Sequence, residues 1–359
     1  MTTALRIAIL GSSSFPIAEP FAGGMEAHIW ELAHTLTSRG HTVTLFAAEG
    51  SVTDVSARNL AVARLDLSDI SKASNTQSEL AVSEHHAYLS VMLDLAGTLA
   101  DEFDVVHNHS LHYLPIAMAR TLTTPMITTL HTPPFALLES AVAIAKPAPT
   151  RFMAVSDHLA GQWERMLGKV DVVPNGIALD CWPEGPGGDY AVWSGRLVPE
   201  KGPHLAIDAA RAAGVPLRLA GPIWDERYFR EYVSPRLGGD VVYEGHLRRR
   251  ELAALVGGAV AALVTPVWDE PYGLVVAEAL ACGTPVAAFE RGGIPEIVDD
   301  TCGRLAAADD VPALAKALLD AMTLSRSAAR ARAERVCAGD RMVDRYEQLY
   351  ASAIAGAVR

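Results

Sequence analysis

The chain has 359 residues, of which 50% are hydrophobic and 20% charged, and a formal net charge of −12. Its length favours two domains, each with enough apolar residues to bury its own core. The acidic balance argues against nucleic acid as a partner, because proteins that neutralise many phosphates carry a basic patch or stripe. The longest basic run, Arg248–Arg250, lies between Glu244 and Glu251 and indicates the solvated start of a helix.

The sequence also bears on the cellular compartment. Four cysteines, none in a CxxC pair or at metal-ligand spacing, predict free thiols in a reducing compartment. The strand-like run Arg6–Leu10 follows the N-terminus without a charged and then apolar leader. No apolar stretch has the length that a membrane-spanning helix requires. We therefore expect a soluble, cytoplasmic protein with no integral membrane segment.

Short apolar runs alternate with helix-like segments through the first half of the chain. Apolar runs bounded by turn residues suit strands that are buried on both faces, and alternation with helices predicts a parallel, doubly wound sheet. The expected strands are Arg6–Leu10, Val43–Ala47, Asp104–His107, Met126–Leu130, Phe152–Val155 and Val170–Val173. The expected helices are Gly24–Arg39, His112–Leu122 and Asp157–Met166.

The pattern breaks at Pro183–Asp189, where three glycines and two prolines indicate an interdomain linker, with a hinge region from Pro174. A second α/β series follows, so we expect two Rossmann-like domains whose functional residues lie in strand-to-helix loops. Its expected strands are Tyr190–Trp193, Leu217–Ala220, Val241–Tyr243, Val260–Val264 and Pro285–Phe289. Its expected helices are Pro203–Ala213, Arg249–Gly257, Gly273–Cys282 and Val311–Met322, with a last helix at about Asp340–Ala355.

The strongest functional signal is the segment Trp268–Leu280, in which a helix is expected to open at about Tyr272. Glu270 would lie in the loop, and Glu278 about two turns into the helix. The first amides of such a helix favour an anionic group, whereas the two acids suit sugar or ribose hydroxyls. The alternative is that Asp269 and Glu270 only complement the helix dipole and that Glu278 is a surface residue.

A second signal is the glycine-containing loop Ser194–His204, which carries Arg196 and Lys201. An arginine that forks onto phosphate oxygens and a lysine that acts as a point charge suit a diphosphate. A surface loop in which Lys201 pairs with Glu200 is the alternative. The first strand is followed by an irregular loop and then Gly23–Glu26, whose glycines would either bring amides near phosphates or form a plain turn.

Together these segments resemble family-4 glycosyltransferases, a retaining family with the GT-B fold. The family's two glutamates separated by seven residues match Glu270 and Glu278. The resemblance covers nearly the whole chain and is most specific over 190–300. The other segments that carry it are 270–275, 281–286, 292–296, 195–197 with 201–202, 23–26 with 32–33, 173–177 and 341–350. The chain departs from many members in its long, irregular loop 12–22 and in Asp269, which bear on acceptor and sugar identity.

The resemblance implies two domains that face each other across a cleft. Residues 1–174 would bind the acceptor, 175–189 would form the hinge, and 190–339 would bind the nucleotide sugar. Residues 340–359 would form a helix that crosses back onto the N-terminal domain. Closure about the hinge would exclude water and limit hydrolysis of the donor.

The resemblance also assigns roles to residues. Arg196 and Lys201 would bind the diphosphate, Glu278 the ribose, and Glu270 the donor sugar and phosphate. His131 resembles the family's histidine that contacts the transferred sugar; a structural histidine at a strand end is the alternative. The implied catalytic residues are thus His131, Arg196, Lys201 and Glu270. The remaining implied donor contacts are Gly23, Gly24, Gly245, His246, Leu247, Gly273, Leu274 and Val275.

His107, His109 and His112 lie close together in the sequence, which raises the question of a metal site. Their spacing, with no acidic or cysteine ligand beside them, is not a zinc pattern. Packing at the strand end or contact with the acceptor is the preferred interpretation. No metal and no cofactor are therefore expected.

The expected reaction transfers a sugar from a nucleoside-diphosphate sugar, UDP-hexose first and a GDP-sugar second, to a small soluble acceptor. Arg196, Lys201 and the helix amides would oppose the charge on the leaving oxygen, and attack would come from the front face. One rival is a nicotinamide-dependent dehydrogenase, but Gly11–Ser14 does not supply its glycine fingerprint. The other is a non-catalytic protein that binds nucleotide sugars, against which both glutamates and both cations argue.

Overall fold

The computed structural model describes residues 4–52, 55–60, 65, 67–74, 77–145 and 150–357. The chain divides into two compact units. Unit 1 comprises Met1–Val155, Leu159–Val173 and Val343–Arg359, and unit 2 comprises Ser156–His158 and Pro174–Met342. The C-terminal segment therefore belongs to the N-terminal unit.

Unit 1 is built on a seven-stranded parallel sheet in the order β3-β2-β1-β4-β5-β6-β7. The side chains of Ile7–Leu10 in the central strand β1 are fully buried, as expected where helices cover both faces of a parallel sheet. Strand order reverses between β1 and β4, and in such sheets ligands bind beyond the carboxyl ends at the reversal. The strands are β1 (Arg6–Leu10), β2 (Thr42–Ala47), β3 (Ser56–Asn59), β4 (Val105–Asn108), β5 (Met126–Leu130), β6 (Arg151–Ala154) and β7 (Asp171–Val172).

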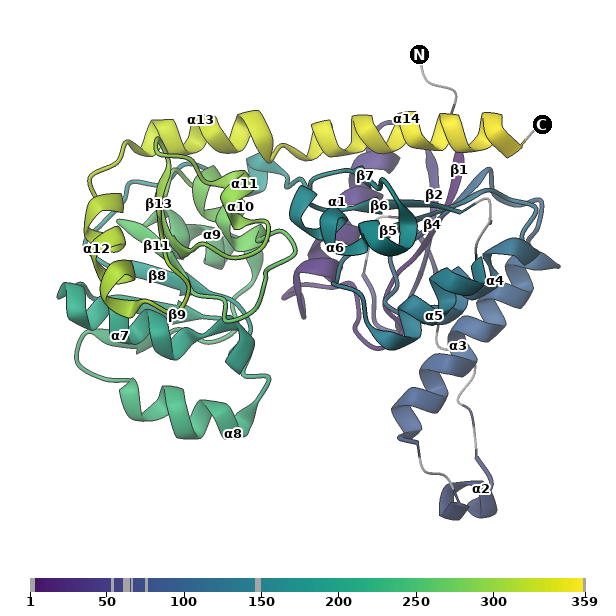
Figure 1. Ribbon diagram of the computed structural model, residues 1–359, viewed down its shortest axis with the longest axis horizontal. Coiled ribbons are helices and arrows are strands. Elements are labelled where there is room, and N and C mark those ends of the chain that lie inside the picture. The colour runs from purple at the N-terminus through teal and green to yellow at the C-terminus, as the bar shows by residue number, and fades with distance from the viewer. Residues whose placement is uncertain are drawn as a thin grey trace. The chain divides into compact units, whose positions relative to one another are not determined.

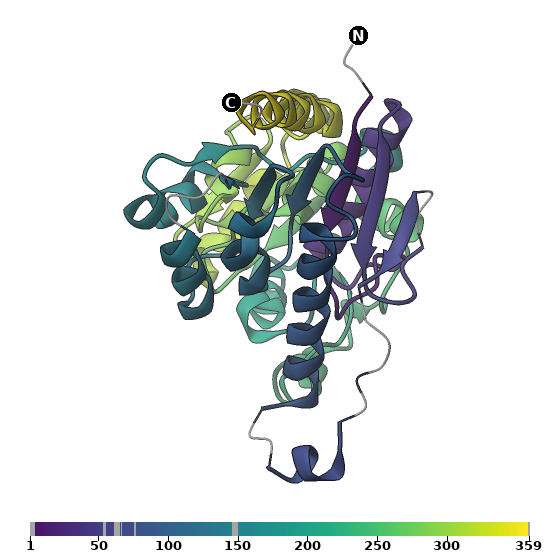
Figure 2. The ribbon, with the colours of Figure 1, turned by 90° about the vertical axis from the view of Figure 1, so that its right-hand side faces the viewer.

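Helices connect these strands, and α3 is the longest helix between two of them. Ser78 caps its start by accepting a hydrogen bond from the amide of Ala81 at 3.1 Å. Only its C-terminal half packs on the core, and its N-terminal half extends beyond the strands beside α2 (Figures 1 and 2). The helices are α1 (Gly24–Ser38), α2 (Asp69–Ser74), α3 (Glu79–Ala96), α4 (Tyr113–Met118), α5 (Ala136–Ala145) and α6 (Asp157–Leu167).

The last helix, α14 (Gly339–Ala357), packs on unit 1 from Val343 onward. Its Tyr346 and Tyr350 are fully buried. Tyr350 Oη lies 2.8 Å from His107 Nδ1, and Tyr346 Oη lies 3.1 Å from Thr129 Oγ1. The C-terminal helix therefore completes the core of unit 1, and its two tyrosines contact residues of β4 and β5.

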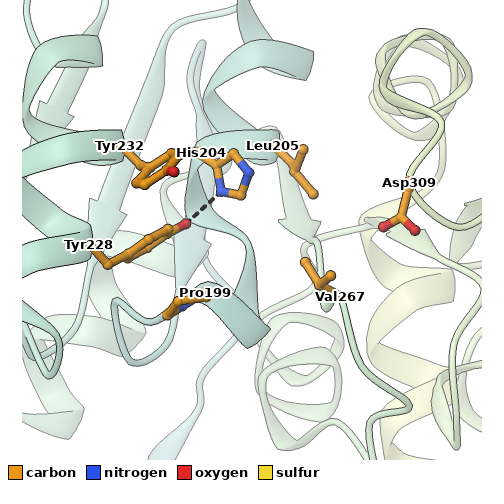
Figure 3. Close-up of a pocket in the computed structure, with 7 residues that line it drawn as sticks. All are labelled: Pro199, His204, Leu205, Tyr228, Tyr232, Val267 and Asp309. Atoms are coloured by element: carbon orange, nitrogen blue, oxygen red, sulfur yellow. Dashed lines mark hydrogen bonds between the residues drawn. The ribbon is translucent and has the colours of Figure 1, made fainter.

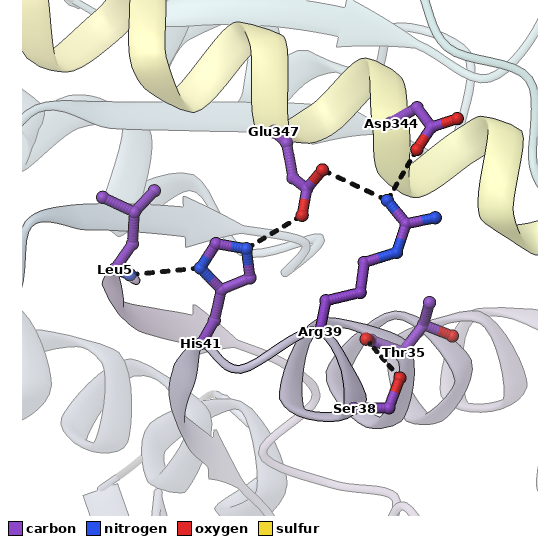
Figure 4. Close-up of polar contacts among 7 residues, drawn as sticks. All are labelled: Leu5, Thr35, Ser38, Arg39, His41, Asp344 and Glu347. Carbon is purple, nitrogen blue, oxygen red and sulfur yellow. Dashed lines mark hydrogen bonds and ion pairs between the residues drawn. The ribbon is translucent and has the colours of Figure 1, made fainter. Parts of the chain in front are cut away.

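A polar network at the surface also holds α14 on unit 1 (Figure 4). Glu347 accepts a hydrogen bond from Arg39 at 3.1 Å, and its other oxygen lies 2.9 Å from His41 Nε2. The second ring nitrogen of His41 accepts from the amide of Leu5 at 3.1 Å. Asp344, one turn earlier on α14, pairs with Arg39 at 2.6 Å. The buried His41 thus links α14 to the start of β1.

Unit 2 repeats this topology with a six-stranded parallel sheet in the order β10-β9-β8-β11-β12-β13. Here the strand order reverses between β8 and β11. A core of buried aliphatic residues with Trp193 and Phe289 lies against one face. The strands are β8 (Ala191–Ser194), β9 (Leu217–Ala220), β10 (Val241–Tyr243), β11 (Ala261–Val264), β12 (Val286–Phe289) and β13 (Gly303–Ala306).

The helices of unit 2 also organise the segment expected as a linker. Arg326 donates to the carbonyls of Gly185 and Gly257, and Arg330 donates to the carbonyl of Trp182. Residues 174–189 therefore pack with unit 2. The helices are α7 (Pro203–Ala213), α8 (Glu226–Tyr228), α9 (Arg249–Gly257), α10 (Leu274–Ala281), α11 (Ile294–Ile297), α12 (Val311–Ala321) and α13 (Arg326–Val336).

The two parallel α/β sheets confirm the predicted fold class, and the expected strands agree with the observed ones to within one residue at either end. The expected helix His112–Leu122 is split into α4 and a 3₁₀ turn, Ala119–Thr121. Sequence reasoning missed β3, α2, α3, α5, α8, α11, β13 and α13. The helix α5 is apolar almost all round and α13 consists largely of alanine and arginine, so neither shows a strong 3.6-residue contrast.

Candidate active site

Three glycines bring the loops after β8, β9 and β10 together at the carboxyl edge of the unit 2 sheet. The amide of Gly195 donates to the carbonyl of Ala220 at 3.0 Å, and that of Gly221 donates to the carbonyl of Gly245 at 2.9 Å. A Cβ atom on Gly221 would lie 1.8 Å from the Gly195 carbonyl oxygen, so no other residue fits there. The loop of Gly221 therefore lies between the loops that carry Arg196 and His246 and contacts both.

The loop after β8 is also joined to the end of β11. Thr265 Oγ1 donates to the carbonyl of Lys201 or Gly202, at 3.1 and 2.9 Å, and accepts from the indole of Trp193 at 3.0 Å. Gly202 has φ +60°, and a Cβ atom there would lie 2.3 Å from the Thr265 carbonyl oxygen. This close approach fixes Lys201 beside the loop that follows β11, at the strand-order reversal.

Lys201 and Glu270 form an ion pair across the reversal. Lys201 Nζ lies 2.5 Å from Glu270 Oε2, and the Trp268 indole donates to the same oxygen at 3.1 Å. The ammonium also lies 5.4 Å from the centre of the Trp268 ring. Both side chains of the pair are mostly buried, with 22% and 15% exposed. Lys201 thus pairs with Glu270, and the alternative pairing with Glu200 is not seen.

Arg196 lies two residues after the end of β8 and is half-buried. Its guanidinium lies 5.4 Å from the centre of the Trp224 ring. Within the ranges that the structure describes, it forms no ion pair with a carboxylate. Arg196 therefore keeps its donors available for a planar anionic group, whereas Lys201 already has a carboxylate partner.

The helix α10 begins at Leu274, four residues after Glu270. Gly273 has φ +102° and is the N-terminal cap residue. The first amides of a helix, here those of Leu274 and Val275, have no acceptor within the helix. The preceding loop is held by the amide of Gly293, which donates to the Glu270 carbonyl at 2.8 Å. The helix start therefore offers donors beside Lys201 and Glu270, an arrangement that favours an anion.

Glu278 lies one turn before the end of α10 and is half-buried. Loss of solvent raises the pKa of this carboxyl to about 7, and the nearby Arg249 opposes the rise. The residue is therefore not the exposed surface acid of the alternative interpretation. Near neutral pH it can accept hydrogen bonds as a carboxylate or donate one as an acid.

The predicted nucleobase segment, Gly245–Leu247, follows β10. Gly245 has φ +87°, and Tyr243 Oη donates to the carbonyl of Gly221 at 2.8 Å. The His246 side chain is exposed. The glycine contacts described above place this segment beside the Gly221 loop, which separates it from the Arg196 loop, on the opposite side from β11 in the strand order.

In unit 1, Gly23 and Gly24 form the start of α1. Gly23 is the cap residue, with extended φ of −165°, and a Cβ atom there would lie 3.1 Å from Glu26 Oε2. The long loop before it is held by Tyr88, whose hydroxyl donates to the Gly11 carbonyl at 2.8 Å and accepts from the amide of Ser13 at 3.2 Å. The two glycines thus open a helix at the edge where β1 ends.

His131 follows β5 and meets two other histidines of unit 1. Its Nε2 lies 3.0 Å from His109 Nδ1, and its ring centre lies 5.1 Å from that of His28. Loss of solvent lowers the pKa of His131 to about 4, so the ring is neutral at physiological pH.

The three histidines that raised the question of metal do not come together as a ligand set. His107 is bound by Tyr350 and by Thr129 Oγ1 at 2.8 Å. His112 caps α4 by accepting from the amide of Leu114 at 3.2 Å, and its ring stacks on Tyr88. Of the two preferred interpretations, packing at the strand end and contact with the acceptor, packing thus holds for His107.

Two family models match the chain. "Glycosyltransferase Family 4" matches residues 22–180, and "Glycosyl transferases group 1" matches residues 183–335. The matches cover most of both units. The chain belongs to the family-4 glycosyltransferases. The resemblance predicted from its motifs is thereby confirmed.

Individual relatives agree with this family. Glycogen synthase of Mycobacterium tuberculosis (strain CDC 1551 / Oshkosh) is 28% identical over 88% of this chain and 86% of the relative. Phosphatidyl-myo-inositol mannosyltransferase of Mycobacterium leprae (strain TN) is 27% identical over 88% and 87%. The structure of Anabaena Alr3699/HepE in complex with UDP-glucose has a TM-score of 0.73 and 19% identity, covering 97% and 100%. The protein is a glycosyltransferase of the GT-B fold that uses a nucleotide-sugar donor.

Three features of this glycosyltransferase were not predicted. Asp269, the extra acid, pairs with His158 at 3.6 Å. Glu296 accepts from the amides of Asp157 and His158 at 2.9 and 2.8 Å. Gly221 was also missed, although a glycine directly after a predicted strand is a signal that could have found it.

Among the described helices none is both long and apolar enough to cross a bilayer.

A hollow of about 430 Å³ lies beside the same loops of unit 2 (Figure 3). It does not fit the diphosphate, because its lining includes none of the predicted donor residues and no arginine or lysine. Loss of solvent lowers the pKa of His204, which lies 2.5 Å from Tyr228 Oη, so this ring is neutral. The lining residues are Pro199, His204, Leu205, Tyr228, Tyr232, Val267 and Asp309.

Proposed function

We propose that this glycosyltransferase moves a hexose from UDP-hexose, or in second place a GDP-sugar, to a small soluble acceptor with retention of anomeric configuration. The observation that carries the proposal is the Lys201–Glu270 pair where the strand order of unit 2 reverses, with Arg196 on the same loop after β8. Two cations and the start of α10 there match a diphosphate.

In the proposed reaction the bond between the anomeric carbon and the diphosphate breaks, and negative charge develops on the leaving oxygen. Arg196, Lys201 and the amides of Gly273, Leu274 and Val275 would stabilise that charge, so no metal is required. Glu270 would accept hydrogen bonds from the donor sugar. Its carboxylate already accepts from Lys201 and Trp268, which weakens it as a nucleophile and supports front-face attack.

The remaining donor contacts are proposed from the family resemblance. Glu278 would bind the ribose hydroxyls, and Gly245, His246 and Leu247 the nucleobase. In unit 1, His131 would contact the transferred sugar, and Gly23 and Gly24 would bring amides near the phosphate. The residues of unit 2 lie on three loops at the carboxyl edge of one sheet and on one helix, which supports a shared role.

The charge of the chain bears on the acceptor. The names of the two relatives refer to glycogen and to phosphatidyl-myo-inositol. Their sequence identities to this chain, 28% and 27%, are nearly equal. The net charge of −12 opposes adsorption to an anionic lipid surface and favours a small soluble acceptor. The same charge and the absence of a long basic run argue against nucleic acid.

The test begins with thermal shifts in the presence of UDP, GDP and their hexose conjugates. A specific ligand at 100 times its dissociation constant stabilises the folded state by about 2.7 kcal/mol. We expect the largest shift in melting temperature with UDP ligands. The shift should be the same with and without a chelator, because no metal is required. NMR of the product should then show the donor's anomeric configuration. Inversion would contradict the mechanism, and binding without cleavage of any nucleotide sugar would favour a non-catalytic protein.

A further inference from the structure

The loop that carries Glu270 lies against the segment that follows β12. Gly292 has φ +60°, and a Cβ atom there would lie 2.1 Å from the Glu270 carbonyl oxygen. The amide of Gly293 donates to the same carbonyl at 2.8 Å. A Cβ atom on Gly293 would lie 2.8 Å from the Pro271 carbonyl oxygen. The two glycines thus allow a close backbone contact, so the position of their segment sets that of Glu270.

This segment leads into α11, which is too short to hold its own position. The helix spans only Ile294–Ile297, with Gly293 as its cap residue, and a single turn has little stability of its own. Contacts with two other helices hold it. Arg332 of α13 donates to the carbonyls of Glu296 and Ile297 at 3.0 and 2.7 Å. The second contact is made by the side chain of Glu296.

The Glu296 carboxylate binds the start of α6. Its two oxygens accept from the amides of Asp157 and His158 at 2.9 and 2.8 Å. The first amides of a helix have no acceptor within the helix, and a carboxylate there also complements the helix dipole. Ser156, Asp157 and His158 belong to unit 2, whereas α6 continues in unit 1 from Leu159. Glu296 therefore joins these three residues to α11 within unit 2.

Ser156 makes a second contact with the loop of Glu270. It is 1% exposed, and its hydroxyl donates to the Pro271 carbonyl at 2.6 Å. A Cβ atom on Gly293 would lie 3.0 Å from Ser156 Cβ, so the serine also packs against the segment after β12. The backbone at Glu270 and Pro271 is thus held by Gly293 and by Ser156, and Glu296 connects the elements that carry them.

We propose that Glu296 is a positioning residue of the transfer reaction and acts through Glu270. The inference rests on the proposed function, in which Glu270 binds the donor sugar. Glu296 fixes α11 and the Gly293 amide, and these fix the backbone from which the Glu270 carboxylate reaches Lys201 at 2.5 Å. A displacement of a reacting group by about 1 Å can lower a rate on the order of a hundredfold. Glu296 itself touches no substrate in this account.

Glu296→Gln tests the proposal because an amide side chain has one acceptor oxygen and can serve only one of the two α6 amides. We expect kcat/KM to fall about tenfold. In a Glu270→Gln background the same substitution should cause less than about a twofold further loss, because the side chain through which it acts is gone. A merely structural role would give the same factor in both backgrounds.

Amide hydrogen exchange, measured by NMR in ligand-free protein, reports the positioning without the reaction. In Glu296→Gln the Gly293 amide should exchange at least about tenfold faster, because its hydrogen bond to the Glu270 carbonyl opens more often. Asp310→Ala is the matched control, since Asp310 accepts from the amide of Ala313 at the start of α12, another helix of unit 2. It should lower the melting temperature but change neither kcat/KM nor Gly293 exchange.

Unchanged Gly293 exchange in Glu296→Gln, or an equal loss of kcat/KM in both backgrounds, would overturn the proposal. Circular dichroism checks folding; if Glu296→Gln does not fold, Ser156→Ala decides, and it should reduce kcat/KM only where Glu270 is present. Full activity of Glu270→Gln would refute the role of Glu270 in the proposed function. The exchange measurement would then still decide whether Glu296 positions the loop.

Discussion

The two sheets share one topology but present opposite chemistry beyond their carboxyl ends. In unit 2 the loops after β8 and β11 carry Arg196 and the Lys201–Glu270 pair. In unit 1 the loops after β4 and β5 carry His109 and His131, which burial keeps neutral. The same scaffold thus holds a charged site in one unit and an uncharged one in the other. Fold alone does not assign a function; the side chains at the strand ends do.

The backbone differs in the same way. Unit 2 places glycines in the left-handed region at its strand-to-helix loops, among them Gly202, Gly245 and Gly273. In unit 1 the described positive-φ glycines are Gly40, Gly50 and Gly168, and Gly11, directly after β1, is not one of them. Amides exposed by such glycines bind anions. This supports placing the diphosphate in unit 2.

Removal of the Arg196 guanidinium should have the largest effect. We expect Arg196→Ala to lower kcat/KM on the order of a hundredfold to a thousandfold, because one donor to the leaving oxygen is lost. The melting temperature should stay the same, since the residue lies in a half-buried loop. Arg227→Ala, an exposed arginine of unit 2, is the control. Near-normal activity of Arg196→Ala would contradict the assignment of the diphosphate site to unit 2.

The Lys201–Glu270 pair should act as a unit. Lys201→Ala and Glu270→Gln should each reduce kcat/KM by about a hundredfold, and the double variant by much less than the product of the two. We expect a coupling of about 0.5–3 kcal/mol in transition-state energy. The exposed Arg227–Glu231 pair should show none. Additive losses in kcat/KM would mean that the two side chains serve separate purposes.

Glu278 should make stability depend on pH. Its pKa of about 7 in the folded protein exceeds its ordinary value, so the folded state binds the proton more tightly than the unfolded state. The contribution to stability is therefore full below about pH 4.5 and is lost as the pH rises to about 7, on the order of 3 kcal/mol.

Denaturant unfolding between pH 4.5 and 7.5 measures this slope, which Glu278→Gln should reduce. In the same variant, affinity for the bare nucleoside diphosphate should fall if Glu278 binds the ribose. If Glu278→Gln bound the nucleoside diphosphate with wild-type affinity, Glu278 would not bind the ribose. An unchanged dependence of its stability on pH would contradict the raised pKa.

The smallest expected effect is on stability and comes from a substitution in unit 1, outside the charged site of unit 2. Glu347→Ala should destabilise the protein by about 1–3 kcal/mol, because Nε2 of the buried His41 loses its partner (Figure 4). Asp344→Ala is the matched control: this side chain is 60% exposed and its loss should cost under about 1 kcal/mol. Thermal unfolding measures both. Equal effects would mean that the link between His41 and α14 does not stabilise unit 1.

The sequence by itself determined the alternation of strands and helices, because runs buried on both faces are apolar without interruption. It also singled out Arg196, Lys201 and Glu270, because charged residues after predicted strands stand out from the apolar pattern, and Glu278, because its spacing from Glu270 matches the family. The structure confirmed the fold class and brought Lys201 to Glu270. The roles of the individual residues remain predictions.

The tertiary structure alone decided which distant residues meet. Spacing suggested His107, His109 and His112 as a group, whereas the fold joins His109 to His28 and His131 and gives His107 to Tyr350. It likewise paired Lys201 with Glu270 in place of the adjacent Glu200. The physical reason is that sheet order and helix packing set these distances, and the contributing segments lie 22 to 243 residues apart along the chain.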